Sequence, residues 1–321
     1  MSGSWLRNRV HFWLMTVIAG ILLSGCGSQY LVLNPKGPVA ETQYNLIIIS
    51  VVLIGIVIIP VLALTAFIVY RYRDTPDNKA SYKPEWAHNT KLEIIWWGIP
   101  IIIIAILGYF TVRDTYVLAE PPTKDVKPIT IQVTSLDWKW MFTYPEQKVA
   151  TVNYVQIPVG VPVQFKLTAD APINSFWVPQ LAGQIYTLPG KETKLWMQAD
   201  EPGEYDGMGA NFSGEGFAKM QFTVVAKPQD EFDKWVQRVI NTTPAMTRQD
   251  YAKLREPGLS ERLTYSSFPD GLFEEIVRKN SEGHDDKQPA AEQQESGQPT
   301  DGGANSNQQM NQPMPEMSKT N

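Results

Sequence analysis

The side chains that hold redox metals are scarce in this chain of 321 residues. It contains one cysteine, Cys26, and three histidines, His11, His88 and His284. Copper and haem sites need thiolate, imidazole or thioether donors brought close together, and these four residues are widely separated. The sequence also has no hydrolase nucleophile motif and no glycine-rich phosphate loop. We therefore expect this chain to bind no metal, no haem and no other cofactor of its own.

One part of the sequence nevertheless has the spacing of a copper-binding loop. Residues 173–179 and 205–220 resemble the copper domain of subunit II of the haem–copper respiratory oxidases, whose ligand pattern is His, a long gap, then Cys-x3-Cys-x3-His-x2-Met. The residues aligned with these ligands are Asn174, Gly209, Ser213, Phe217 and Met220, and Asn211 lies between the two former cysteine positions. Only Met220 keeps the donor that the pattern requires.

The lost ligands distinguish two branches of this family. A lone thioether is a poor copper site, and Cys26 lies too far upstream to replace a thiolate. We expect Asn211 and Ser213 to form hydrogen bonds within the loop instead. The chain thus resembles subunit II of a bacterial quinol oxidase and differs from subunit II of a cytochrome c oxidase. That resemblance implies quinol, and not cytochrome c, as the electron donor, with the haems and the remaining copper in the partner subunit I.

The N-terminus has the features of a bacterial lipoprotein signal. Residues 1–25 read as a signal peptide, with Arg7 and Arg9 before an apolar run. Small residues precede Cys26, which would carry lipid, including palmitate, at the start of an outer segment covering 26–45. The alternative is an uncleaved membrane anchor with an incidental cysteine. The lipid anchor and residues 31–38 look like the aa3-type quinol oxidases of Gram-positive bacteria.

Two later apolar segments are long enough to span a bilayer, which takes about 20 helical residues. We place them at 46–70 and 92–112. The loop between them, 71–91, is rich in cations, and cytoplasmic loops carry such an excess. These cations are Arg71, Arg73, Lys79, Lys83 and Lys91. The loop is therefore predicted to be cytoplasmic, with the mature N-terminus and everything after the second span on the outer face of the bacterial cell membrane.

Glu93 lies at the cytoplasmic start of the second span, followed by Trp96 and Pro100. A carboxylate beside a membrane span is a functional candidate because it is costly to bury. In the haem–copper family, a glutamate at this motif lies at the entrance of a proton pathway into subunit I, and the resemblance implies this role for Glu93. The alternative is an interfacial carboxylate that pairs with Lys91 or reaches water.

In the outer part of the chain, apolar and polar residues alternate with a period of two, which is typical of strands. Strands are expected at 129–133, 149–157, 163–168, 193–198 and 219–225, separated by turns. Short strands at such spacing indicate a sandwich or barrel, and the resemblance implies a cupredoxin-like Greek-key β-barrel within 113–226. An aromatic-rich helical extension is expected at 227–280, including a short helix at 272–279. Residues 281–321 have the composition of a disordered polar tail.

The aromatic segment 137–144 is a second landmark of the family. In copper-bearing relatives this cluster passes electrons from cytochrome c to the copper. Without a copper ligand set, we expect Trp138, Trp140 and Tyr144 to pack at a strand edge or against subunit I, since aromatic side chains dominate cores and interfaces.

The sequence therefore predicts a fold of mixed membrane and β class: a two-helix transmembrane hairpin, the cupredoxin-like barrel and a short helical extension. A net charge of −5 gives no basic patch for nucleic acid. The expected partners are subunit I, further small membrane subunits, membrane lipid and, through the complex, quinol. The competing interpretation is a membrane-anchored scaffold lipoprotein with a cupredoxin fold and no redox role. Two spans and an interfacial carboxylate disfavour it, because a lipid tether alone would hold a scaffold.

Overall fold

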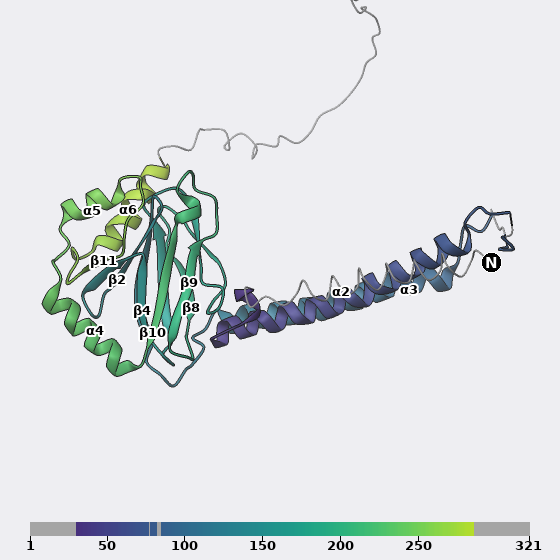
Figure 1. The fold of residues 1–321 in the computed structure, drawn as a ribbon, viewed down its shortest axis with the longest axis horizontal. Coiled ribbons are helices and arrows are strands. Elements are labelled where there is room, and N and C mark those ends of the chain that lie inside the picture. Colours follow the sequence, from purple (N-terminus) through teal and green to yellow (C-terminus); the bar gives the residue numbers. More distant parts are fainter. Residues whose placement is uncertain (1–29, 77, 82–84, 286–321) are drawn as a thin grey trace, which may run out of the picture.

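The computed structural model describes residues 30–76, 78–81 and 85–285. It consists of a long helical hairpin and a β-domain with helices on its surface (Figure 1). The predicted signal peptide, Cys26 and most of the predicted tail lie outside the described residues.

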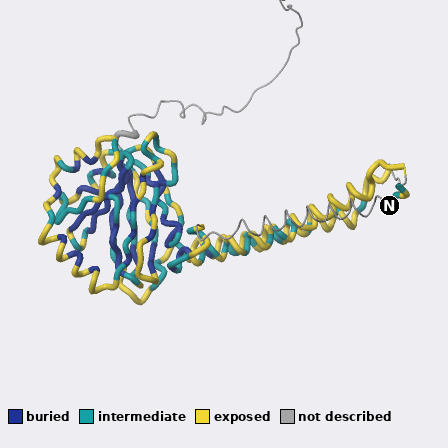
Figure 2. The backbone as a smooth tube through the Cα atoms, in the orientation of Figure 1, coloured by how far each residue is buried: buried dark blue, intermediate teal, exposed yellow. Residues whose placement is uncertain are grey.

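The hairpin is formed by α2 (Pro38–Arg71) and α3 (Thr90–Leu118), which run side by side and follow the short helix η1 (Leu31–Leu33) (Figure 1). Both helices are long and apolar enough to cross a membrane, and most of their length is exposed (Figure 2). At about 1.5 Å per residue, α2 is about 51 Å long, well beyond the hydrocarbon thickness of about 30 Å. The helices therefore extend past the predicted spans 46–70 and 92–112, toward the β-domain.

The β-domain contains two sheets that face each other. Their strand orders are β11-β3-β2-β1-β5-β8 and β4-β10-β9-β6-β7. The strands are β1 (Ile129–Leu136), β2 (Lys139–Tyr144), β3 (Val149–Val152), β4 (Tyr154–Pro158), β5 (Val163–Ala169), β6 (Asn174–Trp177), β7 (Ile185–Thr187), β8 (Thr193–Met197), β9 (Gly203–Gly209), β10 (Gln221–Lys227) and β11 (Leu263–Tyr265). Most pairs are antiparallel, but β1 pairs with β5 and β10 with β4 in parallel.

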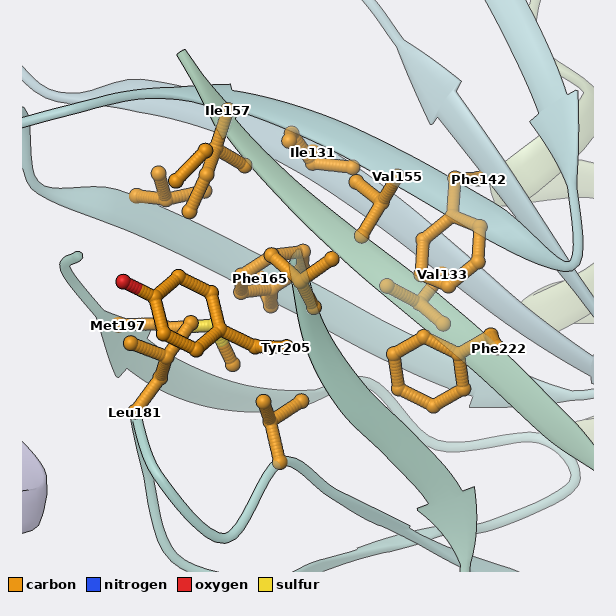
Figure 3. Packing of buried hydrophobic residues seen from close by; sticks show 14 of the residues in the cluster. Ile131, Val133, Phe142, Val155, Ile157, Phe165, Leu181, Met197, Tyr205 and Phe222 are labelled. Atoms are coloured by element: carbon orange, nitrogen blue, oxygen red, sulfur yellow. The ribbon is translucent and has the colours of Figure 1, made fainter. Parts of the chain in front are cut away.

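The core lies between the two sheets and is rich in aromatic rings (Figure 3). Phe176 and Phe222 stack with their ring centroids 4.8 Å apart, and Trp140 meets both rings edge-on. Trp140 and Tyr144 are fully buried in β2, which lies inside the first sheet. The prediction that these two residues pack at a strand edge or against subunit I was therefore wrong, because β2 has a neighbouring strand on each side.

The extension after the barrel contains α4 (Gln229–Thr242), α5 (Arg248–Arg255) and α6 (Leu272–Asp285). It also contributes β11, which pairs with β3, so the extension is not purely helical as expected. Helices α5 and α6 cover the outer face of the first sheet, where Leu136 and Met141 pack against Leu254 and Ile276. The buried face of α4 packs instead against the core between the sheets. The helix expected at 272–279 continues to Asp285.

Asp170 fastens this extension to the barrel. Its side chain, only 4% exposed, lies 2.6 Å from Nε of Arg255 and 3.9 Å from Nζ of Lys279. The hydroxyl of Tyr251 donates to Asp170 Oδ2 at 2.7 Å, and the amide of Asn280 donates to Oδ1 at 3.2 Å. Burial, together with the neighbouring carboxylate, raises the pKa of Tyr251 above its usual range. Tyr251 therefore stays protonated and remains a donor.

Asp170→Asn should destabilise the chain by about 2 kcal/mol, since hydrogen bonds to a charged group each contribute about 1.5–3 kcal/mol and the partly exposed Arg255 is screened by water. Urea unfolding followed by circular dichroism would measure the change. Asp270→Asn is the matched control, because Asp270 pairs with Lys148 at the surface and is 92% exposed. Equal stability of Asp170→Asn and the control would contradict this role.

A tight junction connects the hairpin to the barrel. The chain before α2 joins the barrel through Lys36, whose N–H donates to the carbonyl of Gln180 at 2.7 Å. Val39 and Ala40 at the start of α2 are buried, and Val39 belongs to the barrel core. At the end of α3, Trp196 Nε1 donates to the carbonyl of Ala119 at 3.2 Å. The outer ends of both helices are thus built into the barrel.

Candidate functional site

Four of the six former copper-site positions converge at the ends of three elements. Asn174 opens β6 and is 1% exposed, Gly209 ends β9, and Met220, also 1% exposed, lies between η2 (Phe217–Lys219) and β10. Asn174 Nδ2 donates to Ser213 Oγ at 2.9 Å and to Met220 Sδ at 3.0 Å. Asn174 Oδ1 accepts from the N–H of Ser175 at 2.7 Å. The Asn174 amide therefore bonds to two other residues, Ser213 and Met220, that align with the copper-ligand pattern.

Gly209 gives this amide its space. A Cβ added at Gly209 would lie 2.9 Å from Asn174 Oδ1, closer than ordinary van der Waals contact. Any side chain at this position would have to displace the Asn174 carboxamide. The Asn174 amide thus occupies the space into which a side chain at position 209 would point.

The other two positions lie at the edge of the loop. Asn211 Nδ2 donates to the carbonyl of Ile173 at 3.2 Å. Phe217 packs edge-on against Phe212, with ring centroids 5.6 Å apart, while Phe212 itself is 77% exposed. These contacts hold the loop but do not point into the amide cluster.

The donors at this site do not fit a copper ion. Copper centres in proteins use thiolate, imidazole and thioether ligands. Gly209 and Phe217 supply no donor atom, and the Asn174 amide group directed at Met220 is itself a hydrogen-bond donor. The thioether of Met220 is thus an acceptor in a hydrogen bond, and the remaining Ser213 hydroxyl is a hard oxygen ligand.

Trp138 fixes the same loop from the other side. It has a φ of 62°, a left-handed conformation that is unusual for a residue other than glycine. Its indole Nε1 donates to the carbonyl of Ser213 at 3.1 Å. The ring lies so close to Gly216 that a Cβ there would be 2.3 Å from it. Trp138, unlike Trp140 and Tyr144, therefore packs at the barrel surface, against the former copper loop.

Glu93 is at the other end of the molecule, in the first turn of α3 and far from the barrel (Figure 1). Asn89 caps this helix by accepting from the N–H groups of Lys91 and Leu92, each at 3.1 Å. Glu93 Oε1 lies 3.0 Å from His88 Nδ1, and its side chain is 36% exposed. The structure therefore brings a titratable imidazole to the carboxylate at the predicted cytoplasmic end.

The contact between His88 and Glu93 was not predicted, because neither metal-ligand spacing nor a nearby nucleophile singles out His88 in the sequence. The available signal was Asn89 immediately before an apolar run, since asparagine is a favoured helix cap. A cap at Asn89 places His88 just outside the helix and Glu93 in its first turn, where the two side chains can meet.

The fold and this site define a class of protein: two candidate membrane helices followed by a cupredoxin-like domain. Within that domain, residues 146–227 match the family described as cytochrome c oxidase subunit II, periplasmic domain.

Whole-chain relatives narrow the class. The chain is 47% identical to quinol oxidase subunit 2 of Bacillus anthracis over 262 residues, which cover 80% of this chain and 90% of that protein. It is 43% identical to cytochrome bo(3) ubiquinol oxidase subunit 2 of Pseudomonas putida over 271 residues, covering 84% and 85%. It is 42% identical to quinol oxidase subunit 2 of Bacillus subtilis strain 168 over 257 residues, covering 79% of each. The chain belongs to the family of quinol oxidase subunit II.

Proposed function

We propose that this chain is the non-haem subunit II of a proton-translocating quinol oxidase in an aerobic respiratory chain. The complex oxidises quinol and reduces oxygen to water, with the haems and copper in the partner subunit I. The observation that carries the proposal is the Asn174 amide, which bonds both Ser213 and Met220 where copper ligands would converge. A loop with this cluster lacks the thiolate and imidazole ligands of a copper centre that could receive an electron from cytochrome c.

The barrel would then act by holding and capping subunit I and not by carrying electrons. Its attachment supports this role, because Val39 at the start of α2 packs in the barrel core and Trp196 bonds to Ala119 just after α3. A barrel attached in this way holds the outer ends of the two membrane helices in a fixed position. Further small membrane subunits would complete the complex, with quinol reaching it through the membrane.

Glu93 would supply the carboxylate at the entrance of a proton pathway into subunit I. It is partly exposed, so water reaches it, and it contacts His88. The cationic loop at 71–91 places this end in the cytoplasm by the positive-inside rule. The barrel then lies on the outer face of the bacterial membrane, at the opposite end of the hairpin.

Lipidation of Cys26 after removal of a signal peptide would add a second attachment to the outer leaflet. This part of the proposal rests on the sequence before Cys26. The aa3-type, Gram-positive assignment also remains a proposal. Mass spectrometry of the mature N-terminus would detect the lipid, and an unmodified N-terminus preceding Cys26 would contradict it.

Electron-donor preference tests the main proposal. The purified complex should consume oxygen rapidly with a reduced quinol and should not consume it with reduced cytochrome c. Copper measured in the purified outer chain, separated from subunit I, should be absent. Turnover with cytochrome c would overturn the proposal, whereas an intact complex active with neither donor would favour the scaffold interpretation.

A further inference from the structure

A groove outside the former copper loop lies between β4 and α4. It has a volume of about 330 Å³ and is lined by Gln156, Lys227, Glu231, Lys234, Trp235 and Arg238. In Figure 1, α4 lies on the side of the barrel away from the α2–α3 hairpin. The groove therefore faces the aqueous phase and not the membrane surface.

The floor of the groove contains a side-chain amide, that of Gln156, which pairs with no other described residue. Val155 and Ile157 in β4 are fully buried in the barrel core, so the alternation of a strand turns Gln156 to the opposite face, under α4. The backbone of Gln156 is satisfied by the hydroxyl of Tyr144, which donates to its carbonyl at 3.0 Å and accepts from its N–H at 2.8 Å. Its side-chain amide has no hydrogen bond among the described residues, although the residue is only 8% exposed.

The remaining exposed surface of Gln156 opens into the groove that it lines. The amide is therefore open to water and to a ligand that enters the groove.

The walls of the groove carry excess positive charge, since three cations line it with one carboxylate. Lys227 lies 3.5 Å from Glu231, and Lys234 lies 3.0 Å from Asp230. Arg238 forms no ion pair within the part of the chain that the structure describes. Its guanidinium is thus available as a two-pronged donor, the geometry that suits phosphate and carboxylate groups.

We propose that this groove binds the phosphate group of a small soluble molecule. Arg238 donates to two oxygens of the phosphate, and the Gln156 amide donates to a third oxygen from the floor. Trp235, 9% exposed, closes the groove with an apolar wall. The volume exceeds that of a phosphate ion, so a short organic group bound to the phosphate also fits.

Binding of inorganic phosphate and of glycerol 3-phosphate would test this site. The full chain in nanodiscs of zwitterionic lipid is titrated with each, and 31P line broadening is followed. Both ligands should bind, and Arg238→Gln should weaken binding by about tenfold or more, because it removes the two charge-assisted hydrogen bonds of the guanidinium. Gln156→Leu should also weaken binding several-fold, while its circular dichroism spectrum stays that of the parent chain.

Arg262→Gln is the matched control. Arg262 is an exposed arginine that bonds Thr223 Oγ1 at 2.6 Å outside this groove, so its loss should leave phosphate binding unchanged. Absence of binding, or equal binding by Arg238→Gln and the control, would overturn the proposal. Nanodiscs containing phosphatidylglycerol separate the sources of phosphate. Unchanged titration there supports a soluble ligand, whereas loss of the signal would assign the groove to lipid headgroups and overturn the soluble assignment.

Discussion

Gly37→Ala should destabilise the chain by about 3 kcal/mol, near the upper end of the usual cost of overpacking, and loosen the barrel from its helices. A Cβ at Gly37 would lie 1.9 Å from the carbonyl oxygen of Gln198. This neighbour is backbone and cannot rotate away. The φ of Gly37 is −166°, an extended conformation that alanine also adopts, so the effect is steric. Thermal unfolding of the purified full chain should show a midpoint lower by about 6–12 °C.

Two other glycines provide controls for this substitution. A Cβ at Gly203, in the barrel, would have its nearest neighbour, a ring carbon of Tyr205, at 3.5 Å, and one at Gly98, in α3, would have no neighbour within 4 Å. Alanine at either position should shift the midpoint far less than at Gly37. If Gly37→Ala unfolded at the same temperature as these variants, the backbone at the junction could shift to admit the added Cβ without a loss of stability. The outer ends of the helices would then not be rigidly built into the barrel.

The sequence predicted the membrane helices and the barrel because both depend on local patterns. The apolar spans are long enough to read directly, and strands such as β5 keep their alternation and their expected start at Val163. The predicted strand at 149–157 is two strands, β3 and β4. Asn153 lies between them with a φ of 60°, and its side chain accepts from the N–H of Trp140 at 3.0 Å. That partner is distant in sequence, so hydropathy alone does not reveal the break.

The extension was harder to predict because long-range contacts determine it. β11 has three residues, too few for a recognisable alternation, and its place is set by pairing with β3. In the sequence, Asp170 looks like an ordinary aspartate in a turn. Its burial follows from residues about 80–110 positions later, such as Tyr251 and Asn280. No spacing rule relates these residues before the fold is known.

The candidate site was predicted in outline only. The positions of Asn174, Ser213 and Met220 followed from the resemblance, and the structure brings them together. That Asn174 would bond both of the others, and that Gly209 would leave space for it, required the side-chain geometry. Asn211 and Ser213 do form hydrogen bonds, with the Ile173 carbonyl and the Asn174 amide at the start of β6.

Glu93→Ala should slow quinol-dependent oxygen uptake by about tenfold. This is below the range of about 10²–10⁴ for a positioned acid–base group, because water reaches this exposed position and partly replaces the carboxylate. The effect should appear in turnover and not in assembly, since the Glu93 side chain contacts His88 and no part of the barrel. Steady-state oxygen consumption by the purified complex would measure it, and the haem content of the same preparation would report assembly.

Two variants distinguish a proton carrier from an interfacial charge. Glu93 also lies in the first turn of α3, where a carboxylate interacts favourably with the helix dipole. A loss of activity in Glu93→Ala could therefore come from lost proton transfer or from a less stable helix start. Glu93→Asp keeps a carboxylate and should retain most of the turnover, while Glu93→Gln keeps the shape but cannot release a proton and should match alanine. Glu85→Ala, an exposed carboxylate of the same loop, should leave turnover unchanged. Full activity in Glu93→Gln would reduce Glu93 to an interfacial residue, because only proton transfer requires the acid.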